Sequence, residues 1–386
     1  MPRRSFNFIP KKNIMHSPFN LIRLMLPAIF PFVLFEACST LEEPVSTQEA
    51  ISLAHSIEKW IKNDSAENLN KFIDASAFSK RIKEHAGNAV DQSFLQGVRD
   101  ALKNTDLGQQ IARGIGKKGS YLLIKQYEKD KQQHLVFRLY ADAQVNYHDF
   151  ELIKKDDQVK IADIFIYLTG ETFSATLANS LLMMTEDYGD MPKEEFDKLK
   201  SLKIIKAMMS KNNYDGAKRN YDELPDQFKK QKMFQLINIM ICKELGDSLY
   251  LKALDEYKAF YPAAPNMFLM MIDAYILQQD YLNALKSVNQ LDSLINKDPL
   301  LDYHRALIYK QMDDYEQYQE HLETLNYNMP DFGDGNTELI YCYLETGEMN
   351  KAIELTKRYM NSNEYTEGDP DTYFMLCPDL EKAVNE

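Results

Sequence analysis

Three stretches in the second half of the chain share one pattern and decide its fold: Asp280-Tyr281-Leu282-Asn283-Ala284-Leu285, Asp314-Tyr315-Glu316-Gln317-Tyr318-Gln319 and Glu348-Met349-Asn350-Lys351-Ala352-Ile353. Ala284, Tyr318 and Ala352 follow one another at a period of 34 residues. A tyrosine stands nine positions before each of them, at Tyr275, Tyr309 and Tyr343. A fixed period of this length indicates stacked helix–turn–helix units that bury a shared core.

Less regular copies begin near Asn213 and Gly246, and Pro225, Pro262 and Pro299 stand where helices are expected to end. The pattern resembles the tetratricopeptide repeat, whose period is 34 residues. The resemblance covers about 195–362, or roughly five repeats, and departs from the family at Tyr318, where alanine is usual. It implies an all-α solenoid over residues 193–386 with a C-terminal cap, and a protein or peptide partner.

Residues that could meet such a partner lie off the apolar stripe of the first helix in each repeat. In the stretch 266–275 this stripe follows the spacing i, i+3, i+4, i+7, which is typical of a helix core. Proteins of the resembled family bind their partners along the groove that the first helices line. The candidates that this resemblance implies are Asn266, Asp273, Tyr303 and Tyr341.

Before the repeats, residues 47–192 predict a separate α+β domain. Helical patterns over 47–112 precede four strand-like runs at 121–128, 133–143, 147–154 and 159–169, with turns expected at Asp130-Lys131, Asn146 and Asp156-Asp157. Short links favour a four-stranded antiparallel meander. Helices followed by such a sheet are similar to the NTF2-like, or SnoaL-like, cone fold, and a cystatin-like sheet is the alternative. Helix is expected to predominate in the whole chain.

The cone resemblance implies a possible pocket at His134 and Asp163, which would make the domain a small-molecule-binding or catalytic module with the repeats as its docking part. His148 and Asp149 stand beside a predicted turn and are expected at the surface. No phosphate-binding, metal-binding or nucleophile motif occurs in the sequence. We therefore expect no catalytic residues, no metal site and no cofactor.

The first 37 residues predict a signal peptide, with basic residues before the apolar stretch LMLPAIFPFVLF at 24–35. The stretch Leu34-Phe35-Glu36-Ala37-Cys38 resembles a bacterial lipobox, which implies cleavage before Cys38, lipidation of that residue and a tether over 38–46. Ordinary signal cleavage is the alternative, and Met15 offers a second start. The expected location is the bacterial cell envelope, with the chain anchored by lipid in the periplasm or at the outer-membrane surface.

Charge narrows the class of partner. The formal net charge is −13, and removing residues 1–37 takes away five basic residues and one acid, which makes it −17. A nucleic-acid binder needs a basic face, so this balance argues against one. The sequence favours a non-catalytic lipoprotein scaffold whose partner is basic, or at least not anionic. A homodimer formed through an open sheet face is a third possibility.

Overall fold

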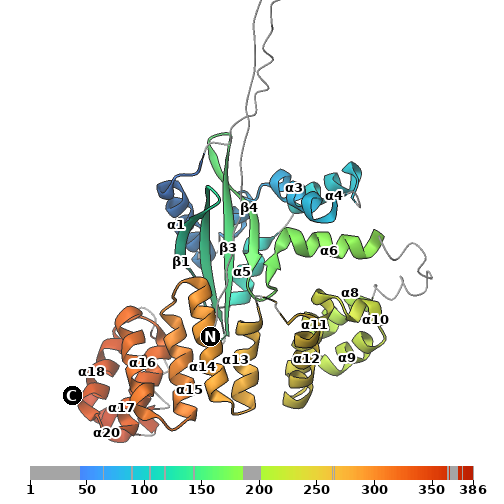
Figure 1. The fold of residues 1–386 in the computed structure, drawn as a ribbon. Helices are drawn as coiled ribbons and strands as arrows, with labels where there is room; N and C mark the ends of the chain where they lie inside the picture. The colour runs from blue at the N-terminus through green and yellow to red at the C-terminus, as the bar shows by residue number, and fades with distance from the viewer. Residues whose placement is uncertain are drawn as a thin grey trace, which may run out of the picture. The chain divides into compact units, whose positions relative to one another are not determined.

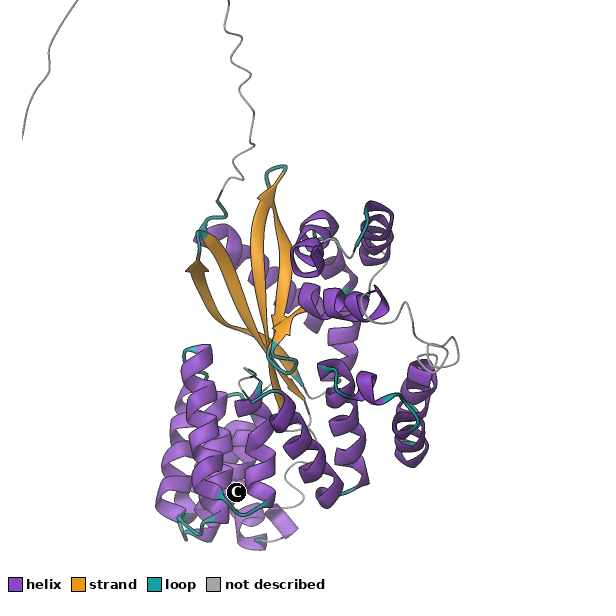
Figure 2. Cartoon of the chain, turned by 45° about the vertical axis from the view of Figure 1, so that its right-hand side comes forward, coloured by secondary structure: helices purple, strands orange, loops and turns teal. Residues whose placement is uncertain are grey.

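The computed structural model describes residues 44–63, 65–87, 90–103, 106–116, 119–141, 144–185, 201–262, 264, 266–362, 365, 373–375 and 377–385. The predicted signal peptide, Cys38, most of the tether and the predicted domain boundary at 192/193 lie outside these residues. The described chain is mostly helical, with one sheet after the first helices (Figure 1, Figure 2). None of its helices is long and apolar enough to cross a membrane.

The first helices are α1 Thr47–Lys62, α2 Glu67–Asn70, α3 Ala75–Ala86, α4 Gln92–Lys103 and α5 Leu107–Ile115. At the start of α1, the Ser46 hydroxyl accepts a hydrogen bond from the Glu49 N–H, and the Glu49 carboxylate accepts one from the Ser46 N–H. This reciprocal pair satisfies amides that a helix start leaves open. Ile57 of α1 and Ile111 of α5 share one buried cluster with Phe137 of the sheet, so both helices cover the same face (Figure 1).

The sheet is an antiparallel meander in the order β1-β2-β3-β4-β5. Its strands are β1 Ser120–Lys129, β2 Gln132–Ala141, β3 Gln144–Lys155, β4 Gln158–Ile166 and β5 Glu171–Thr172. Two hairpins turn at Asp130-Lys131 and Asp156-Asp157, where every residue has positive φ. Such turns match the twist of the strands that they join. The antiparallel order and these two turns confirm the sequence predictions.

Two expectations about the sheet are wrong. The sheet has five strands rather than four, because β5 pairs with the end of β4 after a reversal that includes left-handed Gly170 (φ 65°). A strand of two residues is too short to show the alternation that reveals longer strands. Asn146 lies inside β3 rather than at a turn, and its side-chain oxygen accepts hydrogen bonds from the N–H groups of Tyr147 and Leu168. The NTF2-like and cystatin-like folds both stay predictions.

The rest of the described chain is helical (Figure 2). Its helices are α6 Phe173–Thr185, α8 Ser201–Met209, α9 Tyr214–Asp222, α10 Asp226–Lys229, α11 Lys232–Leu245, α12 Asp247–Phe260, α13 Met267–Leu277, α14 Tyr281–Ile295, α15 Leu300–Gln311, α16 Tyr315–Asn328, α17 Gly333–Glu345, α18 Met349–Met360 and α20 Pro378–Asn385. Consecutive helices pair, α13 with α14, α15 with α16 and α17 with α18. Of the predicted apolar stripe at 266–275, Met271 and Ile272 are buried, whereas Phe268 and Tyr275 are half-buried.

The same turn recurs between the helices of these three pairs. Gln279, Asp313 and Gly347 take positive φ values of 57°, 57° and 79°. In each turn, the next residue donates its N–H to the carbonyl of a tyrosine five positions earlier, over 2.7–3.0 Å. The three hydrogen bonds run from Asp280 to Tyr275, from Asp314 to Tyr309 and from Glu348 to Tyr343. The 34-residue period of the sequence is therefore also a period of backbone geometry.

The second face of the sheet is covered in part by the helical region. Val136 and Tyr147 belong to the same buried cluster as Leu300 and Leu301 of α15. The face is buried where the aromatic side chains of Tyr140 and Tyr147 meet the helical region.

Polar contacts fix this junction. Arg138 of β2 forms an ion pair with Asp298, and these side chains are 3% and 0% exposed. The Asp298 carboxylate also accepts a hydrogen bond from the Tyr147 hydroxyl at 2.9 Å. One repeat further along, Asp334 accepts a hydrogen bond from the Tyr140 hydroxyl. The sheet is thus tied to two successive repeats, to the first by a buried ion pair, which is costly to leave unpaired, and to the second by a hydrogen bond to the exposed Asp334.

Candidate functional site

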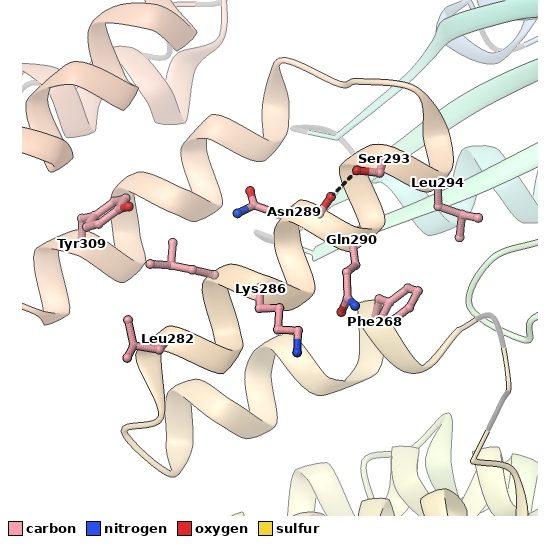
Figure 3. Close-up of a pocket in the computed structure, with 9 residues that line it drawn as sticks. Phe268, Leu282, Lys286, Asn289, Gln290, Ser293, Leu294 and Tyr309 are labelled. Carbon is pink, nitrogen blue, oxygen red and sulfur yellow. Dashed lines mark hydrogen bonds between the residues drawn. The ribbon is translucent and has the colours of Figure 1, made fainter. Parts of the chain in front are cut away.

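An open pocket of about 700 Å³ runs along the outer face of α14 (Figure 3). We call it the α14 groove and define it by its lining residues: Phe268, Leu282, Leu285, Lys286, Asn289, Gln290, Ser293, Leu294 and Tyr309. Phe268 comes from α13 and Tyr309 from α15, so the groove joins two repeats. The Gln290 side chain lies beside the Phe268 ring (Figure 3).

Helical spacing explains why α14 carries this surface. Its buried residues are Ala284, Ser287, Val288, Leu291 and Ile295, which pack against the neighbouring helices. Leu282, Lys286, Gln290 and Leu294 recur every four residues and form a single row on another face. The leucines at the two ends of the row remain 73% and 44% exposed. Exposed leucines that border a pocket are a feature of protein-binding surfaces.

A network of charges holds the wall of the groove on the α15 side. Arg305 donates to the Asn289 side-chain oxygen at 2.9 Å and forms ion pairs with Asp292 and Asp302. Asp302 also pairs with His321. Burial of Asp302 opposes its ionisation, but the hydrogen bonds from His321 and Arg305 outweigh it and lower the pKa of the carboxyl. These charges satisfy one another, which leaves the Asn289 amide held at a fixed position.

Lys286 and Gln290, in the middle of the row, have no hydrogen-bond or ion-pair partner among the described residues. Lys286 is exposed and is the one charged residue that lines the groove in the described part of the chain. The groove therefore presents an apolar, a cationic, an amide and an apolar side chain in that order along one helix.

The four partner-binding candidates lie elsewhere. Asn266 is 1% exposed, and its amide donates to the Leu168 carbonyl at 2.9 Å and accepts from the Tyr257 hydroxyl at 3.0 Å. Tyr303 is buried with its ring edge-on to a phenylalanine, and Tyr341 is half-buried with its ring edge-on to a tyrosine. Asp273 is exposed and forms an ion pair with a lysine of α11. The structure thus gives Asn266 an internal role, linking the helical region to the loop after β4.

His134 and Asp163, the two pocket candidates, do not line the α14 groove, and they lie on β2 and β4 with β3 between them. His134 is on the second face of the sheet, where its Nδ1 lies 3.0 Å from Asp149 and its ring stacks on Tyr127. The Tyr127 hydroxyl donates to the other oxygen of Asp149. Both oxygens of Asp149 are therefore engaged by side chains of the sheet.

Asp163 lies on β4, with its carboxylate against the first turn of α6. Its carboxylate accepts hydrogen bonds from the N–H groups of Ile164 and Ser174 at 2.8 and 3.1 Å and from the Ser174 hydroxyl. Burial raises the pKa of Asp163, although these hydrogen bonds oppose the shift. The side chain fixes the first turn of α6 to β4, which is a capping contact. In the described residues no three His, Cys, Asp or Glu side chains are placed to hold a metal ion.

The residues of the α14 groove are the ones that the sequence reasoning missed. It placed the binding surface on the first helix of each repeat, whereas α14 is a second helix. A usable signal was present, because Leu282 and Leu294 lie outside the buried stripe of that helix. A single exposed leucine needs no explanation, so the signal becomes useful only when both ends of one row carry one.

Comparison with known proteins adds little to this geometry. No family model matches the chain. No curated protein matches it either. Among solved structures, one titled "Crystal structure of MamA protein" is similar at 15% identity and a TM-score of 0.36, over 46% of this chain and 94% of that one. A similarity this low does not establish a shared fold and assigns no function.

Proposed function

We propose that this chain is a non-catalytic protein-binding scaffold whose helical region, a solenoid of tetratricopeptide type, holds a segment of a partner in the α14 groove. The observation that carries the proposal is the pair of exposed leucines, Leu282 and Leu294, at the two ends of an open pocket along α14. The repeated turn geometry at a 34-residue period supports the repeat type.

A selection of random displayed peptides against the purified chain tests this proposal. We expect peptides that bind the unaltered chain and lose binding to a Leu282→Ser, Leu294→Ser variant. Burying one leucine is worth about 1.5–3 kcal/mol, so affinity is expected to fall at least tenfold. Leu249→Ser is the matched control, because Leu249 is 42% exposed and lies on α12 outside the groove. Selected peptides that bind the double variant equally well would contradict the assignment of the groove.

We also propose that Cys38 carries the lipid that holds the scaffold at the bacterial cell envelope. The lipobox-like residues before Cys38 and the basic, then apolar leader support this location. Cys38→Ala is expected to move the chain from the membrane fraction to the soluble fraction, as judged by immunoblotting. Retention of the Cys38→Ala variant in the membrane would instead assign the anchor to the apolar stretch at 24–35.

A further inference from the structure

We infer that the α14 groove binds an extended peptide segment that presents one carboxylate between two apolar side chains. The inference rests on the proposed function and adds the chemistry and conformation of the partner segment. It follows from the row Leu282, Lys286, Gln290, Leu294, which offers an apolar, a cationic, an amide and an apolar group in turn.

The spacing of this row matches an extended chain. Four residues of an α-helix rise about 6 Å. Two residues of an extended strand advance roughly 6.7 Å and bring the next side chain onto the same face. Side chains 1, 3, 5 and 7 of an extended heptapeptide therefore fall opposite successive members of the row with little loss of register over its length.

The amides in the middle of the groove favour an extended segment over a helix. A helical ligand satisfies its own backbone, whereas an extended one brings unpaired N–H and C=O groups that need partners. Gln290 has no hydrogen-bond partner among the described residues and can both donate and accept. Asn289 has its oxygen occupied by Arg305, which orients its amide N–H groups as donors.

Charge complementarity sets the remaining position. Lys286 has no ion-pair partner among the described residues, whereas the nearby Arg305 is already paired with Asp292 and Asp302. A carboxylate is the group that complements an isolated ammonium. Because Lys286 is one step of the row from Leu282, the acid is expected two residues from one of the apolar side chains. The net negative charge of the chain disfavours further acids in the segment.

Synthetic fluorescein-labelled heptapeptides test the inference by fluorescence anisotropy. The probe has leucine at positions 1 and 7, glutamate at position 3 and serine elsewhere. A peptide with glutamine at position 3 removes the charge, and one with glutamate at position 5 tests the opposite chain direction. Against the unaltered chain, we expect one of the two glutamate peptides to bind two- to fivefold more tightly than the glutamine peptide, as for an exposed ion pair.

The Lys286→Gln variant completes the test. It is expected to erase the preference for glutamate, so that the glutamate and glutamine peptides bind this variant with equal affinity. Equal binding of all three peptides, or a glutamate preference that survives in Lys286→Gln, would overturn the inference. The proposed function would still stand in that case if Leu282→Ser, Leu294→Ser weakens binding.

Two further outcomes separate the inference from the proposed function. If random display yields groove-dependent peptides while no heptapeptide binds, the extended acidic segment is wrong and the scaffold function stands. Selected sequences with apolar residues spaced i, i+4 would likewise replace the extended segment by a helix. If neither experiment gives binding that depends on Leu282 and Leu294, both proposals fail together.

Discussion

His148 shows how burial changes the chemistry of one residue. Its ring is buried with Nδ1 3.1 Å from the Tyr121 hydroxyl, and burial lowers the pKa of His148 to about 4. In an unfolded chain the pKa of histidine is about 6.5. Because the folded value is the lower one, the folded chain holds His148 neutral and gains stability from it above pH ~6.5. That contribution is lost as the pH falls towards 4.

We expect His148→Gln to be less sensitive to acid than the unaltered chain. The gap between the folded and unfolded pKa values of His148 corresponds to about 3 kcal/mol. When the pH is lowered from 7 to 4, the unfolding free energy of the unaltered chain should therefore fall further than that of the variant, by up to this amount. Urea unfolding at several pH values measures the difference. His55→Gln, on an exposed side chain, is the control. A difference between the chains that does not change with pH would show that His148 is charged or solvated in the fold.

At this scale the sequence misplaced His148 and Asp149, which it put at the surface beside a turn. Both are buried, because the strand β3 begins at Gln144 and runs through the sheet. His148 lies on the first face, against Tyr121 and opposite Phe137. Asp149 lies on the second face, beside His134. The alternation of residue types along a strand predicts which side chains share a face of the sheet. It does not predict which face of the sheet a distant part of the chain will cover.

At the scale of elements, the turns between helices were predictable because their chemistry repeats with the sequence. Each has a left-handed residue and then an acid at the start of the next helix, and the acids Asp280 and Asp314 cap their helices. The fifth strand was not predictable, because it depends on the reversal that includes Gly170 and on the contact of that loop with Asn266.

Gly170 therefore gives a test of how the loop after β4 meets the helical region. A Cβ on Gly170 would lie 2.8 Å from the Asn266 side-chain oxygen and 3.1 Å from the Asn266 backbone nitrogen. The positive φ of Gly170 would strain the new residue as well. Gly347 has a positive φ but nothing within 4 Å of the same position. We expect Gly347→Ala to cost about 1–2 kcal/mol, the cost of left-handed backbone alone, and Gly170→Ala to cost more. Equal losses in urea unfolding would mean that the loop moves away from Asn266 without cost.

At the scale of the whole described chain, the junction of sheet and repeats should make unfolding cooperative. The one tryptophan, Trp60, lies in α1 and packs on Phe72, so its fluorescence reports the N-terminal half. Circular dichroism at the helical band reports mainly the repeats. We expect the two signals to change at the same urea concentration, because Arg138 and Asp298 are buried at the contact.

Removing one partner of this ion pair should separate the transitions. Asp298→Ala leaves the Arg138 charge buried without a partner, which typically costs about 3–5 kcal/mol. A double variant, Arg138→Met with Asp298→Leu, removes both charges and should be less destabilised. A double variant as unstable as Asp298→Ala would indicate that shape rather than charge holds the junction. The sequence does not predict this ion pair, because its two residues are far apart along the chain. Arginine and aspartate are also residue types that usually lie at the surface.

The junction also bears on how the repeat array can lengthen over evolutionary time. Asp298 and Asp334 stand one repeat apart and receive Arg138 and Tyr140 from the same strand. A repeat duplicated between them would carry Asp334 out of reach, so that insertion should be selected against. A repeat added beyond α18 meets no such constraint from these two contacts. Homologues are therefore expected to differ in length after the second acid and to keep the interval between the two acids constant.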